Sequence, residues 1–344
     1  MNRRLEGLIA PLVLLVAIAA VVGLTALSRQ DPGSPDEASE PVVEPTDTAS
    51  PSPSVEPTGP EDRGRRDPRR RGGDDRVPRL RDNPDLPAVT CENPTRTMPL
   101  TVVSYNIKSA KLSNGFDLGL IADQLAGWEP DVVLLQEVDR FRVRSRRQDQ
   151  PALLADRLGM EWAFGANVRL GSTQYGTAIL SRFPILAERN VPLPNRAGGQ
   201  QRGLLWTKLD VEGRPVSVYT THFQHMKSYA DIRREQGIAV ENILREDPNP
   251  SILGGDLNSV PSSPPVGILT SGRMTDSWST ASGGQGATAP AGRPRARIDY
   301  LLHSGELAVT STAVLPTNLS DHRAVRATYE LEVDDECFGP GSVQ

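Results

Sequence analysis

The sequence predicts an α/β fold in which two mixed β-sheets pack face to face and helices cover their outer sides, a four-layer sandwich. Two observations over residues 91–344 predict this fold. Short apolar runs typical of strands outnumber helical patterns, and many neighbouring runs are close enough to form hairpins. A doubly wound parallel sheet would instead alternate strands and helices regularly.

The first half of this domain contains two expected helices. The apolar spacing over 117–128 predicts a helix that ends before Pro130, and 150–158 predicts a second one. Apolar runs predict strands at 101–105, 132–135, 177–181, 204–209 and 216–221.

The second half begins with a longer expected helix over 229–245. A buried strand is expected at 251–253, and Gly254-Gly255 should let the backbone turn sharply before Asp256. The Gly-, Ala- and Pro-rich stretch 280–295 should form a mobile loop near the site. Further strands are expected at 296–302, 307–315 and 325–331.

Residues 1–30 contain a candidate membrane anchor. Gly7 to Ser28 carries no charge and is about as long as a helix that spans a bilayer. Arg3 and Arg4 precede it, which places the N-terminus in the cytoplasm and the remainder outside. The alternative is a cleaved signal peptide, which would make the protein secreted. We expect a retained single-pass anchor and an extracytoplasmic domain.

Residues 31–90 are expected to be a disordered linker, because Pro and polar residues dominate its first half and it contains no aromatic residue. Its second half, 63–81, carries nine arginines interspersed with aspartates. This stretch is either a basic patch for an anionic polymer or lipid, or a solvated spacer of mixed charge.

The charge and cysteine content limit the partners of the domain 91–344. It has 26 Lys plus Arg and 28 Asp plus Glu, a net of −2, which argues mildly against a tight nucleic-acid binder. Cys91 and Cys337 bracket the domain, and outside the membrane they are expected to form a disulfide that ties its two ends together. Two unpaired thiols are the alternative.

Polar side chains follow several of the expected strands. Glu137 closely follows four apolar residues, and a buried carboxylate is costly unless a cation pairs with it. Asp256 and Asn258 are two residues apart on an expected extended segment, so both should point into the same space. Acids, amides and histidines without a thiolate suit a hard divalent cation, Mg²⁺ or Mn²⁺, and a phosphate ester.

Histidines supply the expected proton chemistry. His322 is the candidate general base, and Asp299 is expected to orient its ring. His222 ends a strand and could donate to a phosphate oxygen or the leaving group. His225 and His303 are expected to be supporting or surface residues.

At these residues the chain resembles the endonuclease/exonuclease/phosphatase superfamily, the group that has the pancreatic deoxyribonuclease fold. Seven motifs occur in family order across residues 99–332. They are Ser104-Tyr105-Asn106, Leu135-Gln136-Glu137, Tyr175-Gly176 leading into Ala178 to Arg182, Thr221-His222-Phe223, Gly255 to Asn258, Arg297 to Tyr300 and Ser320-Asp321-His322. One departure is Ile107 to Ala110, where many members carry a histidine- or glycine-rich run.

The resemblance implies roles for these residues. Asn106 and Glu137 would bind or position the metal, with Asp321 nearby. His322 with Asp299 would activate water, His222 would assist the phosphate or leaving group, and Asp256 and Asn258 would orient the nucleophile and phosphate. Arg202 matches a position that contacts phosphate, and Tyr175 is a further substrate-binding candidate.

Three function classes follow. The first is an anchored, metal-dependent, monomeric phosphoesterase acting on phosphodiesters, either nucleic acid or a phospholipid or sphingomyelin headgroup, with inositol phosphates as a further alternative. Five arginines within 140–147 favour a polyanion, or form only a solvated loop. An inactive binding module would be expected to lack an acid or histidine, and none is missing. A serine hydrolase is disfavoured because the Gly-x-Ser-x-Gly elbow is absent.

Overall fold

The computed structural model describes residues 95–112, 115–282 and 284–334. They lie within a compact unit that spans Leu80–Gln344. The expected anchor at 1–30, the linker at 31–90 and both cysteines lie outside the described residues. In the part that the structure describes, no helix is both long and apolar enough to cross a membrane.

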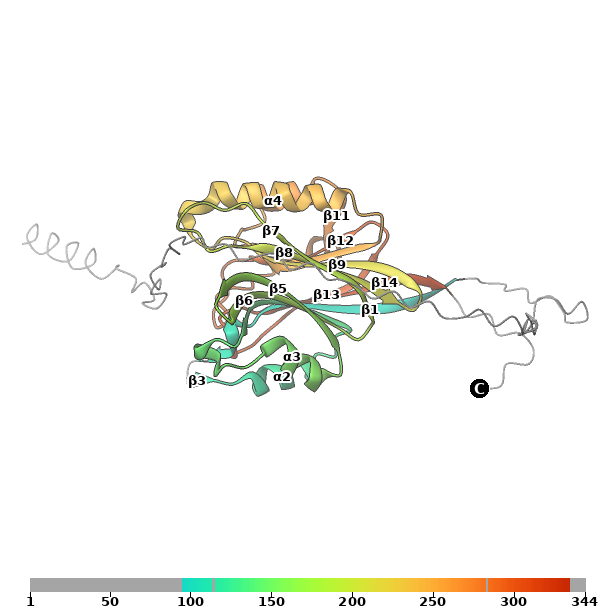
Figure 1. Cartoon of the computed structure of the whole chain (residues 1–344). Helices are drawn as coiled ribbons and strands as arrows, with labels where there is room; N and C mark the ends of the chain where they lie inside the picture. The colour runs from blue at the N-terminus through green and yellow to red at the C-terminus, as the bar shows by residue number, and fades with distance from the viewer. Residues whose placement is uncertain (1–94, 113–114, 283, 335–344) are drawn as a thin grey trace, which may run out of the picture. The chain divides into compact units, whose positions relative to one another are not determined.

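Two six-stranded mixed sheets lie face to face with helices on their outer sides, which confirms the four-layer sandwich (Figure 1). The first sheet has the strand order β13-β14-β1-β4-β6-β5. Its strands are β1 (Thr95–Asn106), β4 (Val132–Arg140), β5 (Glu161–Leu170), β6 (Thr173–Ser181), β13 (Ala308–Leu315) and β14 (Ala324–Asp334).

The second sheet has the order β11-β12-β10-β9-β8-β7. Its strands are β7 (Ile185–Pro192), β8 (Gly203–Val211), β9 (Arg214–His222), β10 (Ser251–Asp256), β11 (Met274–Asp276) and β12 (Asp299–Ser304). A separate ribbon joins β2 (Lys111–Leu112) to β3 (Gly115–Phe116).

The helices fall into two groups, one on each outer face. Helices α2 (Leu118–Gly127) and α3 (Gln150–Leu158) pack on the first sheet, close to the positions expected from their apolar spacing. Helices α4 (Ala230–Arg245) and α5 (Pro264–Thr270) pack on the second. The shorter elements are α6 (Ser277–Ala281) and three 3₁₀ turns, η2 (Lys108–Ala110), η3 (Val143–Ser145) and η4 (Lys227–Tyr229).

Adjacent residues of the central strands face different cores. Val102 and Leu134 pack between the sheets, whereas the next residue in β1, Val103, packs under α2 and α3. A strand covered on both faces needs apolar side chains at successive positions. This explains why the central strands appear in the sequence as continuous apolar runs.

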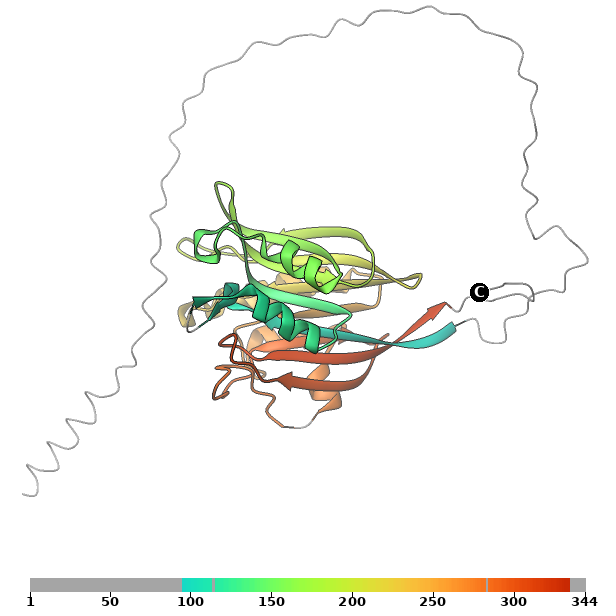
Figure 2. The same ribbon diagram turned by 90° about the horizontal axis from the view of Figure 1, so that it is seen from below.

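The ends of the described domain lie side by side. β1 and β14 pair in antiparallel register, with Thr95 opposite Asp334, and they extend together from the sandwich (Figure 2). The Cys91–Cys337 disulfide stays a prediction, because both residues lie beyond this pair.

The glycine pair before Asp256 has a different role from the expected turn. β10 continues through Gly254 and Gly255 to Asp256. A Cβ on Gly255 would lie 2.1 Å from the Thr221 carbonyl oxygen, and one on Gly254 would lie 2.5 Å from a Leu134 methyl carbon. Glycine is therefore required here because the Thr221 backbone and the Leu134 side chain approach closely, and not because the chain turns.

Candidate active site

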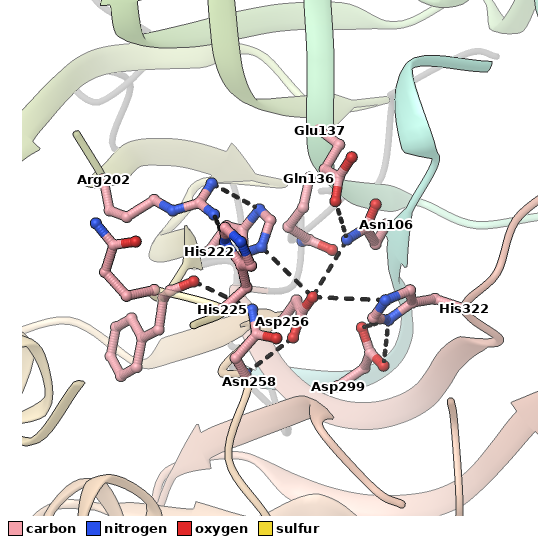
Figure 3. Close-up of polar contacts among 12 residues, drawn as sticks. Asn106, Gln136, Glu137, Arg202, His222, His225, Asp256, Asn258, Asp299 and His322 are labelled. Atoms are coloured by element: carbon pink, nitrogen blue, oxygen red, sulfur yellow. Dashed lines mark hydrogen bonds and ion pairs between the residues drawn. The ribbon is translucent and has the colours of Figure 1, made fainter. Parts of the chain in front are cut away.

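The polar residues expected at strand ends meet at one edge of the sandwich (Figure 3). Parallel pairing of β9 with β10 places His222 beside Asp256, and antiparallel pairing of β10 with β12 places Asp299 on its other side. In the facing sheet, parallel pairing of β1 with β4 places Asn106, the last residue of β1, opposite Gln136, next to Glu137. Strand pairing thus assembles a site from residues far apart in the chain.

Asp256 lies at the centre of this site and is 1% exposed. Its Oδ2 accepts a hydrogen bond from Asn106 Nδ2 at 3.2 Å and lies 3.5 Å from His222 Nε2 and 3.8 Å from His322 Nε2. Burial and the nearby charge of Asp299 raise the pKa of Asp256 to about 7. A neutral or ionised Asp256 is therefore accessible near neutral pH.

His322 and Asp299 form the expected pair. His322 Nδ1 lies 3.0 and 3.1 Å from the two carboxylate oxygens of Asp299, which leaves Nε2 turned toward Asp256. Burial of the ring opposes its protonation, but the charges of Asp299 and Asp256 outweigh this and raise the pKa of His322 to about 10. The structure thus confirms the contact and holds Nδ1 in the protonated form.

His222 is a neutral hydrogen-bond donor in this arrangement. Arg202 Nη1 lies 3.2 Å from His222 Nδ1, and because a guanidinium can only donate, Nδ1 must accept. The ring proton is then on Nε2, which faces Asp256. Burial and the charge of Arg202 hold the pKa of His222 well below its usual range.

Arg202 is a buried cation, 3% exposed, and no carboxylate of the described residues forms an ion pair with it. Besides His222 it contacts His225 Nδ1 at 3.5 Å and the hydroxyl of Tyr175. Its Nε is buried and, within the described residues, has no hydrogen-bond partner. Burial and the charge of Glu137 raise the pKa of Tyr175, so its hydroxyl stays protonated. An anion would complete this pocket.

Glu137 reaches the site through an irregularity of β4. The pairing of β4 with β6 shifts between Leu135 and Val138, and Glu137 has a left-handed φ of 56°. Such a bulge re-aims a side chain. Glu137 Oε1 accepts a hydrogen bond from Asn106 Nδ2 at 3.1 Å, so the amide of Asn106 joins Glu137 to Asp256.

Asp321 lies beside this group in a separate ion pair. Its Oδ2 is 2.7 Å from Lys108 Nζ, and both side chains are about half exposed. Burial alone would raise the pKa of Asp321, but the hydrogen bond from Lys108 and the charge of His322 lower it. Ser320 Oγ donates to the Asn106 carbonyl oxygen at 2.7 Å, which ties the Asp321 turn to β1. Asp321 as a metal ligand stays a prediction.

Residues 280–295 were expected to form a mobile loop. In the structure, residues 284–295 are attached by backbone hydrogen bonds to the turn that carries Asp321. Ala291 N donates to the Asp321 carbonyl oxygen, and Arg323 N donates to that of Thr288. Thr288 is fully buried, and its hydroxyl accepts from the backbone of Asp299. The segment therefore supports both residues of the His322–Asp299 pair.

Asn258 was expected to lie on the same extended segment as Asp256, but the structure shows that it does not. β10 ends at Asp256, and Asn258 has a left-handed φ of 46°. Its Nδ2 donates to the Phe223 carbonyl oxygen at 3.1 Å, while its backbone N donates to Asp256 Oδ1 at 2.9 Å. In the structure Asn258 fixes the Asp256 carboxylate and the strand end that carries His222.

The donor set is suitable for a hard cation. Asp256, Asp299 and His322 offer ligand atoms that all lie within 4.8 Å of one another. Glu137 and Asn106 add oxygen donors next to Asp256. Burial and the charge of Asp299 both raise the pKa of Asp256, and a divalent cation bound nearby would favour its ionised form.

Sequence reasoning missed several supporting contacts. Gln136 is fully buried between the sheets, where its Nε2 donates to Ser104 and Thr220 hydroxyls. His225 was expected to be a supporting or a surface residue, and it contacts Arg202. His303 is buried beside Ser277, in another region of the second sheet. A polar residue at the end of an apolar run was the available signal for Gln136.

Three of the five arginines expected to track a polyanion are paired within the protein. Arg140 makes a bidentate contact with Asp149. Arg144 contacts both oxygens of Asp139, and Arg142 lies 3.9 Å from the same carboxylate. These pairs hold the segment that follows Glu137.

A two-sheet sandwich with a histidine–aspartate pair, a buried arginine and clustered carboxylates at one edge defines a metal-dependent phosphoesterase. The family model described as "Endonuclease/Exonuclease/phosphatase family" matches residues 103–322. The chain belongs to this family, as its seven motifs implied.

Three similar proteins illustrate the match. Over 255 residues the chain is 26% identical to the uncharacterized protein YbhP of Escherichia coli, covering 69% of this chain and 98% of YbhP. It is 32% identical over 150 residues to Protein cwh43 of Schizosaccharomyces pombe, covering 44% of this chain and only 15% of cwh43. The crystal structure of an endonuclease/exonuclease/phosphatase from Beutenbergia cavernae has a TM-score of 0.58 and 28% identity, covering 68% of this chain and 72% of that one.

The compact unit Leu80–Gln344 contains three hydrophobic cores among its described residues. A unit with its own core is expected to fold without the rest of the chain.

Proposed function

We propose that the protein is a membrane-anchored, extracytoplasmic phosphodiesterase that hydrolyses its substrate with Mg²⁺ or Mn²⁺. The buried Arg202 carries this proposal, because no carboxylate of the described residues pairs with it and a phosphate group would supply the missing negative charge. The location rests on the sequence alone, on the apolar segment of 1–30 and the arginines that precede it.

The residues that would hold the cation are Glu137 and Asn106, with Asp256 beside them and Asp321 on the neighbouring turn. Bound there, a divalent cation would neutralise phosphate charge and, by offsetting Asp256 and Asp299, lower the pKa of His322 toward neutrality. The competing arrangement places it among Asp256, Asp299 and His322.

The protein's own residues divide the remaining work. Arg202 and the Nε2–H of His222 donate to oxygens of the phosphate or of the leaving group. Asp299 holds the ring of His322 so that Nε2 faces the water position beside Asp256. That water attacks phosphorus, its proton passes to His322 Nε2, and the ester oxygen leaves.

The substrate divides the proposal into alternatives. A diester of nucleic acid, a sphingomyelin or phospholipid headgroup and an inositol phosphate all present the phosphate that this pocket fits. An inactive binding module is disfavoured, because the histidines, acids and arginine are all in contact in the site.

The test is hydrolysis by purified residues 80–344 of bis(p-nitrophenyl) phosphate, p-nitrophenyl phosphate, supercoiled plasmid and sphingomyelin, with Mg²⁺, Mn²⁺ or EDTA. We expect diester hydrolysis that EDTA abolishes and that Asp299→Asn lowers strongly. The matched control is Asp123→Asn, an exposed carboxylate on α2 whose one ion pair among the described residues is with Arg157. Faster monoester than diester hydrolysis would refute the diester proposal, and equal activity of both variants would refute the site.

A further inference from the structure

A surface near the site combines positive charge with exposed apolar side chains. It is formed by the loop after β4 and the turn between β5 and β6, and we name it the basic-apolar rim. Its residues are Phe141, Val143, Arg146, Arg147, Arg169 and Leu170.

The charge of this rim is uncompensated. Arg146, Arg147 and Arg169 are exposed, and among the described residues none of them has a carboxylate within ion-pair distance. The Arg146 guanidinium lies over the Phe116 ring, 5.4 Å from its centroid. The carboxylates nearby, Asp139 and Asp149, are already engaged by the other arginines of the segment.

The apolar members are unusually exposed for their type. Val143 is 70% exposed, which is the highest value among the large hydrophobic residues that the structure describes, and Leu170 is 58% exposed. Phe141, two residues before Val143, is 37% exposed. Apolar side chains interleaved with arginine are typical of a surface that enters the interface of a bilayer.

Strand pairing brings the two parts of the rim together. Arg140, the last residue of β4, pairs with Gln174 of β6, and Gln174 pairs with Arg169 of β5. The loop and the turn therefore both leave the same end of the first sheet (Figure 2). This is also the end at which Asn106 and Glu137 lie.

The rim is held in place and connected to the site. Phe141 N donates to the Gln148 carbonyl oxygen, and Arg147 N donates to that of Arg142, both at 2.8 Å. Arg144, between the exposed residues, lies 5.2 Å from the centroid of the Tyr175 ring. A ligand on the rim would thus lie beside the phosphate pocket.

We infer that the basic-apolar rim docks the domain on an anionic phospholipid surface and presents a headgroup phosphodiester to the site. The inference rests on the proposed phosphodiesterase and specifies its substrate class. Nucleic acid would satisfy the arginines, but its phosphates would leave Val143 and Leu170 in water, whereas a bilayer interface accommodates both kinds of side chain.

The test measures co-sedimentation of residues 80–344 with vesicles of phosphatidylcholine, with and without phosphatidylserine. Binding is expected only with phosphatidylserine and should weaken with salt. Arg146→Glu/Arg147→Glu should lower partitioning by at least about tenfold, and Val143→Ser/Leu170→Ser by about threefold to tenfold. The matched control, Arg189→Glu/Arg234→Glu, changes the charge equally at exposed arginines of β7 and α4 and should bind as the parent does.

Three outcomes would overturn the inference. They are no binding to anionic vesicles, equal losses in the rim and control variants, and retention of binding by Val143→Ser/Leu170→Ser with equally tight binding of duplex DNA. The last would identify a nucleic-acid surface instead. Hydrolysis of bis(p-nitrophenyl) phosphate separates the two proposals: activity without vesicle binding refutes the rim alone, and vesicle binding without activity refutes the proposed function alone.

Discussion

Two buried arginines in this domain have opposite surroundings. Arg297 is 8% exposed, makes an ion pair with Asp276 at 2.7 Å and lies over the Tyr300 ring at 4.8 Å from its centroid. Arg202 is 3% exposed and has two histidine nitrogens and a tyrosine hydroxyl as neighbours. Within the described residues a carboxylate neutralises the first cation, whereas the second has no ion-pair partner and is proposed to bind the phosphate.

This difference separates a structural charge from a functional one. A buried charge with its own partner contributes to the fold, and removal of one partner leaves the other uncompensated. A buried charge without a partner costs free energy in the ligand-free protein, and the binding of an anion offsets this cost. The same substitution at each position should therefore have opposite consequences.

Arg202→Met should give the largest loss of activity. It removes the cation that meets the phosphate, so kcat/KM should fall about a hundredfold to a thousandfold, as for the loss of one strong donor to a transition state. The free energy of unfolding should stay the same or rise, because an uncompensated buried charge is gone. Steady-state kinetics and urea unfolding measure the two effects, and a large loss of stability would contradict the comparison.

Arg297→Met should show the reverse. It leaves the buried Asp276 without its cation, and the free energy of unfolding should fall by about 3 kcal/mol. The amide of Trp278 and the hydroxyl of Ser279 still donate to Asp276, which limits the loss. Activity per folded molecule should fall far less than in Arg202→Met. If the two variants lost activity equally, Arg297 would also belong to the site.

The sequence allowed the prediction of this site mainly because strand ends converge. Glu137, His222 and Asp256 each follow an apolar run, and strand pairing then determines that they meet. The contact between Arg202 and His222 could not be predicted in the same way. It depends on where β8 begins in the second sheet, 20 residues before the histidine.

The strands that the sequence did not predict show the same limit. Two of the unpredicted strands, β5 and β7, each lie at one edge of a sheet, and polar or charged residues interrupt their apolar residues, so neither is a continuous apolar run. The left-handed backbone at Glu137 and Asn258 was also hidden, since neither position carries a glycine to indicate it. Edges and bulges are determined by tertiary packing more than by local sequence.

Asp256→Asn should change how stability depends on pH in EDTA. The pKa of Asp256 is raised in the folded state, so its contribution is fully present below its ordinary value near 4 and is lost as pH rises through about 7. The parent should therefore lose stability between about pH 4 and 7, and the variant should lose less. His322, with its pKa raised to about 10, adds a loss between about pH 6.5 and 10 in the parent, and this loss should be smaller in the variant because the charge of Asp256 helps to raise that pKa. Thermal melts at pH 5 and 8 test this, and parallel pH profiles would contradict it.

Inorganic phosphate should give the smallest effect and the most direct test of the unpaired cation. At tenfold above its Kd, phosphate should stabilise the parent by about 1.4 kcal/mol and raise Tm by about 3–5 °C. Arg202→Met should lose this shift, because the anion then has no buried cation to meet. Arg297→Met should keep it, although it starts from a lower Tm, since Asp276 and Tyr300 lie outside the phosphate pocket. Melts in EDTA with sulfate and chloride at matched ionic strength separate specific binding from salt effects, and an equal shift in both variants would show that phosphate binds elsewhere.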